Sequence, residues 1–150
     1  MKKHLTFKWI GTTLLVLLIL AQFKSIDKTP GDISPENDFI VIEEVPEEVA
    51  ELFKTACYDC HSNNTNYPWY SNIAPISWWI KRHVRRGVYN LNYSEWGSYD
   101  EGKRKHKKEE SADYIGKGWM PIGPYKLAHP EARLTHQQRE LLVNWLNPTD

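Results

Sequence analysis

Cys57-Tyr58-Asp59-Cys60-His61 is the stretch of this chain that decides its fold and its chemistry. Two cysteines separated by two residues and followed at once by histidine form the attachment signature of c-type haem. Each thiol can form a thioether to one haem vinyl group, and His61 then lies beneath the iron as the proximal axial ligand. The motif therefore predicts one covalently bound haem c per chain.

Other uses of the two cysteines stay open at this point. They are the only cysteines in the chain, and a structural zinc site usually needs four Cys or His ligands. A thioredoxin-like redox pair would be accompanied by a βαβ pattern, which the sequence lacks. A structural disulfide suits an oxidising compartment, but it leaves the adjacent histidine without a role.

The N-terminal segment predicts the compartment. A run without charged residues extends from Trp9 to Phe23, and lysines precede it. Counted back to Leu5, the apolar stretch is roughly 19 residues long, near the lower limit for spanning a bilayer. We therefore expect residues 1–24 to anchor the chain in a bacterial inner membrane, with everything that follows in the periplasm. A cleaved signal peptide is the alternative, although no small-x-small cleavage site follows the run.

The rest of the chain divides into a linker and one domain. Residues 25–44 contain prolines, glycine and acidic residues and resemble a tether, in which Phe39–Ile42 either packs on the domain or forms a short strand. Residues 45–150 then form a single domain of about 105 residues. Because residues 1–24 hold four lysines and no acid, the exported part has 15 basic and 19 acidic residues. This excess of negative charge argues against nucleic acid as a partner.

Apolar residues recur with helical spacing through the domain. The first helix is expected to open at Val45-Pro46 and to run directly into Cys57, and a second is expected from about Pro75 to Gly87. The basic run 103–108 predicts a solvated helix start or loop, or else a docking patch for an acidic partner. The last helix begins at the capping box of Thr135 and Gln138. No strand pattern is present, so we expect an all-α domain with long loops.

Two residues are candidates for the second axial ligand of the iron. Met120 is the only methionine besides Met1, it lies in a glycine- and proline-rich loop, and a thioether is a soft ligand for low-spin haem iron. An ordinary apolar packing role is its alternative. His83 lies on the apolar face of the second helix, where we expect a core or haem-pocket histidine. His129 is expected to serve loop structure.

Several short motifs, in one order along the chain, resemble the bacterial haem-binding domain family of membrane-anchored c-type haem proteins. They are Cys57–His61, Tyr67-Pro68-Trp69-Tyr70, Ala74-Pro75-Ile76-Ser77-Trp78, Leu91-Asn92-Tyr93-Ser94-Glu95-Trp96, Met120-Pro121 and His129-Pro130-Glu131-Ala132. The resemblance implies a mono-haem domain related to small cytochromes c, in which the first and last helices pack together. It also implies Cys57, Cys60 and His61 as haem-binding residues and Met120 as the distal ligand. Ile122 departs from the family, which commonly has a second proline there.

These features favour one-electron transfer over catalysis. No general acid–base pair, nucleophile–histidine arrangement or phosphate-binding loop accompanies the haem motif, and iron bound by both His61 and Met120 has no open position for substrate. We therefore expect a redox partner protein in or at the membrane. A haem sensor or gas-binding module with a displaceable sixth ligand is the main alternative. A peroxidase-like enzyme using His83 with Arg82 or Arg85, and an adaptor that needs haem only to fold, are the others.

Overall fold

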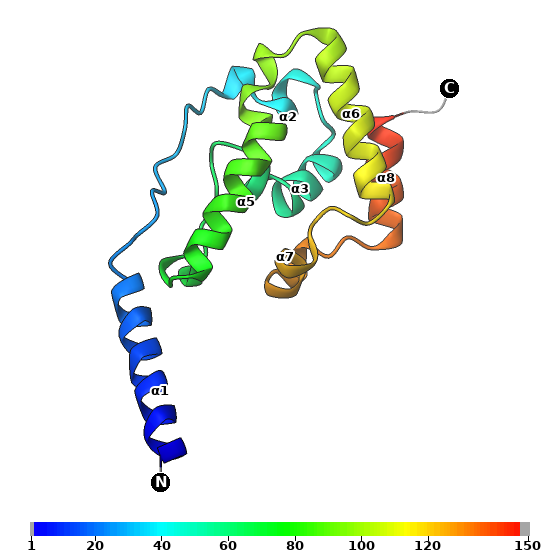
Figure 1. Ribbon diagram of the computed structural model, residues 1–150. Coiled ribbons are helices and arrows are strands. Elements are labelled where there is room, and N and C mark those ends of the chain that lie inside the picture. The colour runs from blue at the N-terminus through cyan, green and yellow to red at the C-terminus, as the bar shows by residue number, and fades with distance from the viewer. Residues whose placement is uncertain (1, 148–150) are drawn as a thin grey trace. The chain divides into compact units, whose positions relative to one another are not determined.

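The computed structural model describes residues 2–147, with side chains from residue 8 onward. Met1 of the predicted anchor segment and residues 148–150 of the predicted domain lie outside it. Within residues 2–147 every regular element is an α-helix or a 3-10 helix, and no strand is present (Figure 1). The prediction of an all-α fold is confirmed. The chain divides into two compact units, one containing the residues up to Thr29 together with Tyr67–His83 and the other containing the remainder.

The first unit contains α1 (Lys2–Ala21), the 3-10 turn η2 (Trp69–Asn72) and the first half of α5 (Ile76–Asn90). The large apolar side chains of α1 from Trp9 to Leu20 are all about half exposed or more. In the part of the chain that the structure describes, no helix combines the length and the apolar character that a membrane crossing needs. The predicted membrane anchor therefore has no support from the structure.

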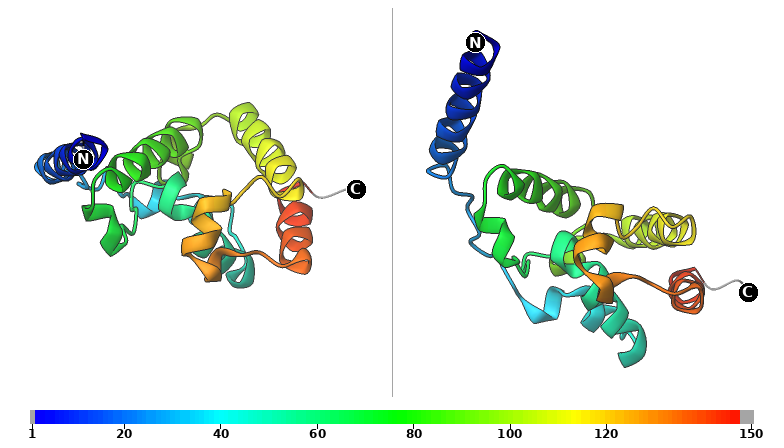
Figure 2. Two further views of the ribbon diagram at one scale, coloured as in Figure 1. Left: turned by 60° about the horizontal axis from the view of Figure 1, so that its bottom comes forward. Right: turned by 90° about the horizontal axis from the view of Figure 1, so that it is seen from below.

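The second unit carries the remaining elements. In chain order they are η1 (Pro35–Asn37), α2 (Phe39–Ile42), α3 (Glu47–Ala56), α4 (Tyr58–His61), η3 (Tyr93–Ser98), α6 (Glu101–Gly116), α7 (Gly123–Ala128), η4 (Pro130–Ala132) and α8 (His136–Leu146). Helices α6 and α8 lie side by side, and the views agree on this pairing (Figure 2). Thr135 and Gln138 form the expected capping box at the start of α8.

An aromatic cluster forms the core of the second unit. Phe39 of α2 is fully buried and packs edge-on against Phe53 of α3 and Trp96 of η3, with ring centroids 5.0 and 4.8 Å apart. Phe53 also meets Trp145 of α8, with ring centroids 6.0 Å apart. The predicted pairing of the first and last domain helices is therefore confirmed. Edge-on rings add favourable quadrupole interactions to the burial of apolar area.

The structure differs from the expected linker and loops in length and form. Phe39–Ile42 packs on the domain, which was one of its two expected alternatives, but it does so as a helical turn and not as a strand. Packing with this core therefore starts at Phe39, ahead of Val45. Asp38 caps this turn, because its carboxylate accepts a hydrogen bond from the backbone N–H of Ile40 at 2.9 Å. Much of the expected loop between α5 and α6 is likewise helical, as η3. Short turns of this kind carry too few residues for a helical period to appear in the sequence.

The basic run 103–108 lies inside α6, a helix of 16 residues, and is not a loop. Three of its cations have partners within the second unit. Arg104 donates to the carbonyl oxygens of Trp96 and Gly97, Lys107 pairs with Glu110, and Lys108 pairs with Glu43. These contacts favour the structural interpretation of the run over a docking patch.

Candidate functional site

The Cys-x-x-Cys-His motif forms one helical turn directly after α3. Cys57 caps α3, and its carbonyl oxygen accepts hydrogen bonds from the backbone N–H groups of Cys60 at 3.1 Å and His61 at 3.0 Å. Both thiols are free and half-buried, so the disulfide alternative is not seen. The turn thus brings the three predicted haem-binding residues together.

His61 is oriented by a backbone carbonyl. Its Nδ1 lies 3.1 Å from the carbonyl oxygen of Leu91, so this nitrogen carries the proton and donates a hydrogen bond. In this tautomer Nε2 carries no proton, which is the form a metal ligand needs. Burial lowers the pKa of His61, although its hydrogen bond to Leu91 acts in the opposite direction. The imidazole is therefore held neutral, which is the form that binds metal.

Hydrogen bonds hold the backbone on both sides of the Leu91 carbonyl group. Leu91 donates its N–H to the carbonyl oxygen of Gly87 at 2.9 Å, which continues the end of α5. The next residue, Asn92, donates its backbone N–H to the hydroxyl of Tyr99 at 3.0 Å. The Asn92 side chain in turn donates to Asn63 Oδ1 at 2.9 Å, in the loop that follows the motif. Backbone groups from two directions therefore place the Leu91 oxygen.

Gly87 lets the end of α5 approach the motif. A Cβ added at this position would meet the carbonyl oxygen of Cys60, and Cys60 Cβ at 3.3 Å. The distance to the oxygen would be far below any that real Cβ atoms show. Only glycine permits this packing, so the sequence of α5 helps to fix the backbone of the second cysteine.

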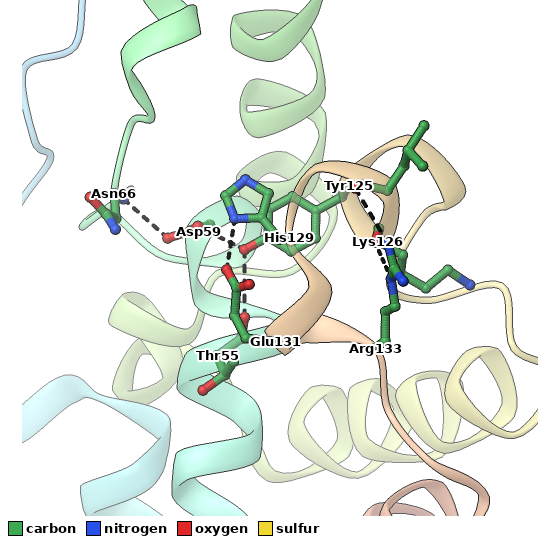
Figure 3. A network of polar contacts seen from close by, with 9 residues as sticks. Thr55, Asp59, Asn66, Tyr125, Lys126, His129, Glu131 and Arg133 are labelled. Carbon is green, nitrogen blue, oxygen red and sulfur yellow. Dashed lines mark hydrogen bonds and ion pairs between the residues drawn. The ribbon is translucent and has the colours of Figure 1, made fainter.

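The two middle residues of the motif bond it to different segments of the second unit. Tyr58 donates its hydroxyl to Asp38 Oδ1 at 2.8 Å and stacks on Tyr93, with centroids 5.1 Å apart. Asp59 accepts a hydrogen bond from the hydroxyl of Tyr125 at 2.8 Å and another from the backbone N–H of Asn66 at 3.1 Å (Figure 3). Both residues act in positioning the turn.

Tyr125 links the motif to the segment that follows Met120. It belongs to α7, and its ring stacks on His129 with centroids 4.3 Å apart and an interplanar angle of 16°. Nδ1 of His129 lies 3.0 Å from Glu131 Oε1 (Figure 3). Burial and the hydrogen bond to Asp59 raise the pKa of Tyr125, so its hydroxyl stays a donor. The expected structural role of His129 agrees with these contacts.

Met120 lies just beyond a glycine-capped helix end. Gly118 has φ of 72°, in the left-handed region, and the N–H groups of Gly118 and Trp119 bond to the carbonyl oxygens of Ile115 and Tyr114. This pair of bonds is the Schellman arrangement that ends a helix. The N–H of Met120 also bonds to Tyr114, and its carbonyl oxygen accepts from Arg139 of α8 at 3.3 Å. The Met120 side chain is half-buried in the same unit as the motif.

His83 belongs to the first unit, on α5. Its Nδ1 lies 2.9 Å from the Trp79 carbonyl oxygen one turn earlier, and its ring lies 3.9 Å from the Trp79 ring. The side chain is half-exposed and is not in a core. Its suggested role in a haem pocket stays a prediction.

The donor set fits a covalently attached haem. Burial raises the pKa of Cys57 to about 12 and that of Cys60 to about 11, so both thiols are neutral. Cys57 also packs against the hydrophobic core. Among the described residues no group of three or more His, Cys, Asp or Glu could hold a metal ion. The zinc alternative therefore finds no set of protein ligands there, whereas a porphyrin supplies four of the ligands that iron needs.

Sequence reasoning missed the residues that support the motif. Gly87 was expected only to end a helix, and Leu91, Asp59 and Tyr125 had no assigned role. Leu91 acts through its backbone oxygen, which no side-chain pattern reveals. The position of Asp59 inside the motif was the one available signal.

A model of the haem-binding domain family matches residues 16–148 of the chain. This match spans nearly the whole chain, including the motif, Met120 and α8. No curated protein and no solved structure matches the chain.

Proposed function

Because the chain belongs to the haem-binding domain family, we propose that it is a mono-haem c-type cytochrome that transfers one electron at a time. Its domain is small and cytochrome c-like. Cys57 and Cys60 form the thioethers, His61 is the proximal axial ligand and Met120 is the distal one. The protein has no catalytic residues of its own and is not an enzyme.

The observation that carries this proposal is the orientation of His61. A histidine that donates Nδ1–H to a carbonyl and follows directly on two unpaired cysteines presents Nε2 in the tautomer that ligation requires. A histidine with only a structural role would have no need of free cysteines on the same helical turn.

The chain's own residues account for the rest of the site. When bound, the haem iron exchanges one electron between its ferric and ferrous states. Buried Tyr93 packs near the His61 ring, with centroids 6.2 Å apart, and excludes water from this side. The bonds to Tyr114 and Arg139 hold the Met120 backbone. Protein groups that do not move when the iron is oxidised or reduced keep the reorganisation energy of electron transfer small, as an electron carrier requires.

Covalent attachment is tested by mass. The purified protein, expressed with the machinery for haem c maturation, should be heavier than the bare polypeptide by one haem. Cys57→Ala with Cys60→Ala should leave no haem after acid-acetone extraction. A wild-type mass equal to that of the polypeptide alone would refute the attachment.

The sixth ligand separates an electron carrier from a sensor. With Met120 on the iron, the oxidised protein should show the weak red-edge band of sulfur–iron coordination, and the reduced protein should not bind carbon monoxide. Met120→Ala should create carbon monoxide binding and lower the reduction potential. His83→Ala is the matched control and should leave the spectrum unchanged. Rapid carbon monoxide binding by the wild type would favour the haem-sensor alternative.

The proposed location is the periplasmic face of a bacterial inner membrane, with α1 as the attachment and a membrane-associated redox protein as the partner. The support is the basic residues that precede the apolar run of α1. The haem protein should remain with the membrane fraction after a high-salt wash. Recovery of a soluble mature protein without its first 20 or so residues would indicate a cleaved signal peptide instead.

A further inference from the structure

The first unit exposes several large apolar side chains close to the C-terminal end of α1. The Trp69 side chain is 76 % exposed, Ile76 45 % and Trp79 42 %, and Ile73 and Trp78 are exposed as well. Ile76 and Trp79 are three residues apart on α5 and so lie on the same face of that helix. We call the segment Trp69–Arg82 the aromatic platform.

The platform is fixed to the end of α1 by hydrogen bonds. The side-chain amide of Gln22 both donates to the carbonyl oxygen of Ala74 at 3.1 Å and accepts from its N–H at 3.0 Å. Trp78 donates its Nε1–H to the carbonyl oxygen of Lys24 at 2.9 Å. These bonds join two segments about fifty residues apart in the sequence, and they place the platform where α1 ends.

Lys28 adds a third attachment. Its ammonium group donates to Ser71 Oγ and to Asn72 Oδ1, each at 2.7 Å, in the η2 turn of the platform. With Gln22 and Lys24, three residues that follow α1 therefore bond to the platform. The exposed tryptophans therefore lie on a segment that these hydrogen bonds hold in place at the end of α1.

Charge is strongly uneven between the two units. The first unit contains seven lysines and arginines and a single acidic residue, Asp27, whereas the chain as a whole is neutral. Beside the platform the cations are Lys24, Lys28, Lys81 and Arg82. A surface that combines exposed tryptophan with lysine and arginine matches the headgroup layer of an anionic bilayer, where indole rings and basic side chains gather.

We propose that the aromatic platform lies in the headgroup layer of an anionic phospholipid bilayer, at the end of α1. Lipid fits better than a protein partner because the large side chains of α1 are apolar and exposed all round the helix, and one protein face would cover only one stripe. The proposal rests on the proposed membrane location but is independent of the haem. It gives the first unit a role of its own, which is to bind the lipid surface.

Depth-dependent fluorescence quenching tests this proposal on the full-length, haem-loaded protein. The protein is reconstituted into vesicles of phosphatidylethanolamine and phosphatidylglycerol that contain phosphatidylcholine brominated near the headgroup end of its acyl chains. These lipids should quench the tryptophan emission, and Trp69→Phe with Trp79→Phe should reduce that quenching measurably, with the remainder coming from Trp9 and Trp78. Trp119→Phe removes an exposed tryptophan of the second unit and should leave the quenching unchanged.

A second experiment tests the contribution of charge to lipid binding. Replacing phosphatidylglycerol with phosphatidylcholine should weaken the quenching in the wild type, and Lys81→Gln with Arg82→Gln should remove this dependence on lipid charge. The haem spectrum should be unchanged in the variants of Trp69, Trp79, Lys81 and Arg82, because these residues belong to the first unit and not to the haem site.

Three results would overturn the proposal. Vesicles that float with the protein but quench Trp69→Phe with Trp79→Phe as strongly as the wild type would leave α1 as the attachment and remove the platform from the lipid. Failure of the protein to float with vesicles would overturn both the platform and the membrane location, while the haem spectrum would still report the haem site. Lipid-independent cross-linking between platforms would assign the surface to a second copy of the chain.

Discussion

Gly87 is the residue on which the backbone of the haem motif depends most directly. Its missing Cβ lets α5 touch the carbonyl of Cys60, and four residues later Leu91 offers the oxygen that orients His61. One helix end therefore controls both the position of Cys60 and the tautomer of His61.

Gly87→Ala should reduce the yield of covalent haem and destabilise the second unit. Alanine gains roughly 0.5–1 kcal/mol over glycine from helix propensity, but overpacking against a backbone oxygen costs about 1–3 kcal/mol, so the net change is a loss. The measurements are the haem-to-protein absorbance ratio and the midpoint of urea unfolding. Gly123→Ala is the control, because nothing lies within 4 Å of a Cβ added there. Equal haem yields in the two variants would contradict the role given to Gly87.

At the same scale, the candidate haem-binding groups could be named from the sequence, whereas the residues that support them could not. Cys57, Cys60 and His61 follow from the spacing of the motif, and the structure brings them together on one helical turn. Gly87 and Leu91 contribute an absent side chain and a backbone oxygen. Neither leaves a pattern in the sequence, so only the fold identifies them.

Among the elements, α2 is held by the carboxylate that ends it. Glu43 accepts hydrogen bonds from Lys108 of α6 at 2.8 Å and from Trp96 of η3 at 2.9 Å, and its side chain is mostly buried. Burial alone would raise the pKa of Glu43, but these two hydrogen bonds outweigh it and hold the pKa below its usual value. A single side chain thus joins three elements around Phe39.

Glu43→Gln should lower the free energy of unfolding by about 1–2 kcal/mol at neutral pH, because charged hydrogen bonds are stronger than neutral ones. Since the folded pKa of Glu43 is lowered, its stabilising effect is complete above the pKa of the unfolded chain and is lost as the pH falls through the folded value. The difference between wild type and variant should therefore shrink in acid. Urea unfolding across pH measures it, with exposed Glu44→Gln as the control. A difference independent of pH would show that the charge of Glu43 is not responsible.

The long elements were predictable and the short ones were not. The capping box of Thr135 and Gln138 marks the start of α8, and the expected pairing of the first and last domain helices is made by Trp145 and Phe53. By contrast, α2 and η3 contain four and six residues. Their form depends on caps such as Asp38 and on burial in the aromatic core, which are tertiary effects that override local pattern.

At the scale of the whole molecule, the division into two units follows the division of charge. The first unit is basic and exposes most of its large apolar side chains, whereas the second has an apolar core around Phe39 and carries the acidic excess. The proposed lipid contact belongs to the first unit, and the haem motif belongs to the second. From the sequence, the excess of basic residues could be seen only for residues 1–24. Lys81 and Arg82 are far away in the sequence and belong to the first unit only in the folded structure.

The second unit has a core in which protein side chains contact one another. Phe39, Phe53, Trp96 and Leu142 are its largest fully buried apolar residues, and they come from four different elements. The family's cofactor adds to such a core, as any tightly bound group stabilises the folded state that binds it. We therefore expect haem to strengthen the domain and not to be required for its helices.

The Cys57→Ala, Cys60→Ala variant tests that expectation. It should keep most of the far-ultraviolet helical signal of the wild type, because the aromatic core stays intact, but it should unfold at a lower temperature. Circular dichroism spectra and melting curves of the two proteins give both quantities, and Cys57→Ser with Cys60→Ser controls for the loss of side-chain volume. A variant with no helical signal would mean that the core cannot form unless haem is attached. The protein would then fit the adaptor alternative, in which haem is needed only for folding. A measured reduction potential would be the only remaining support for electron transfer.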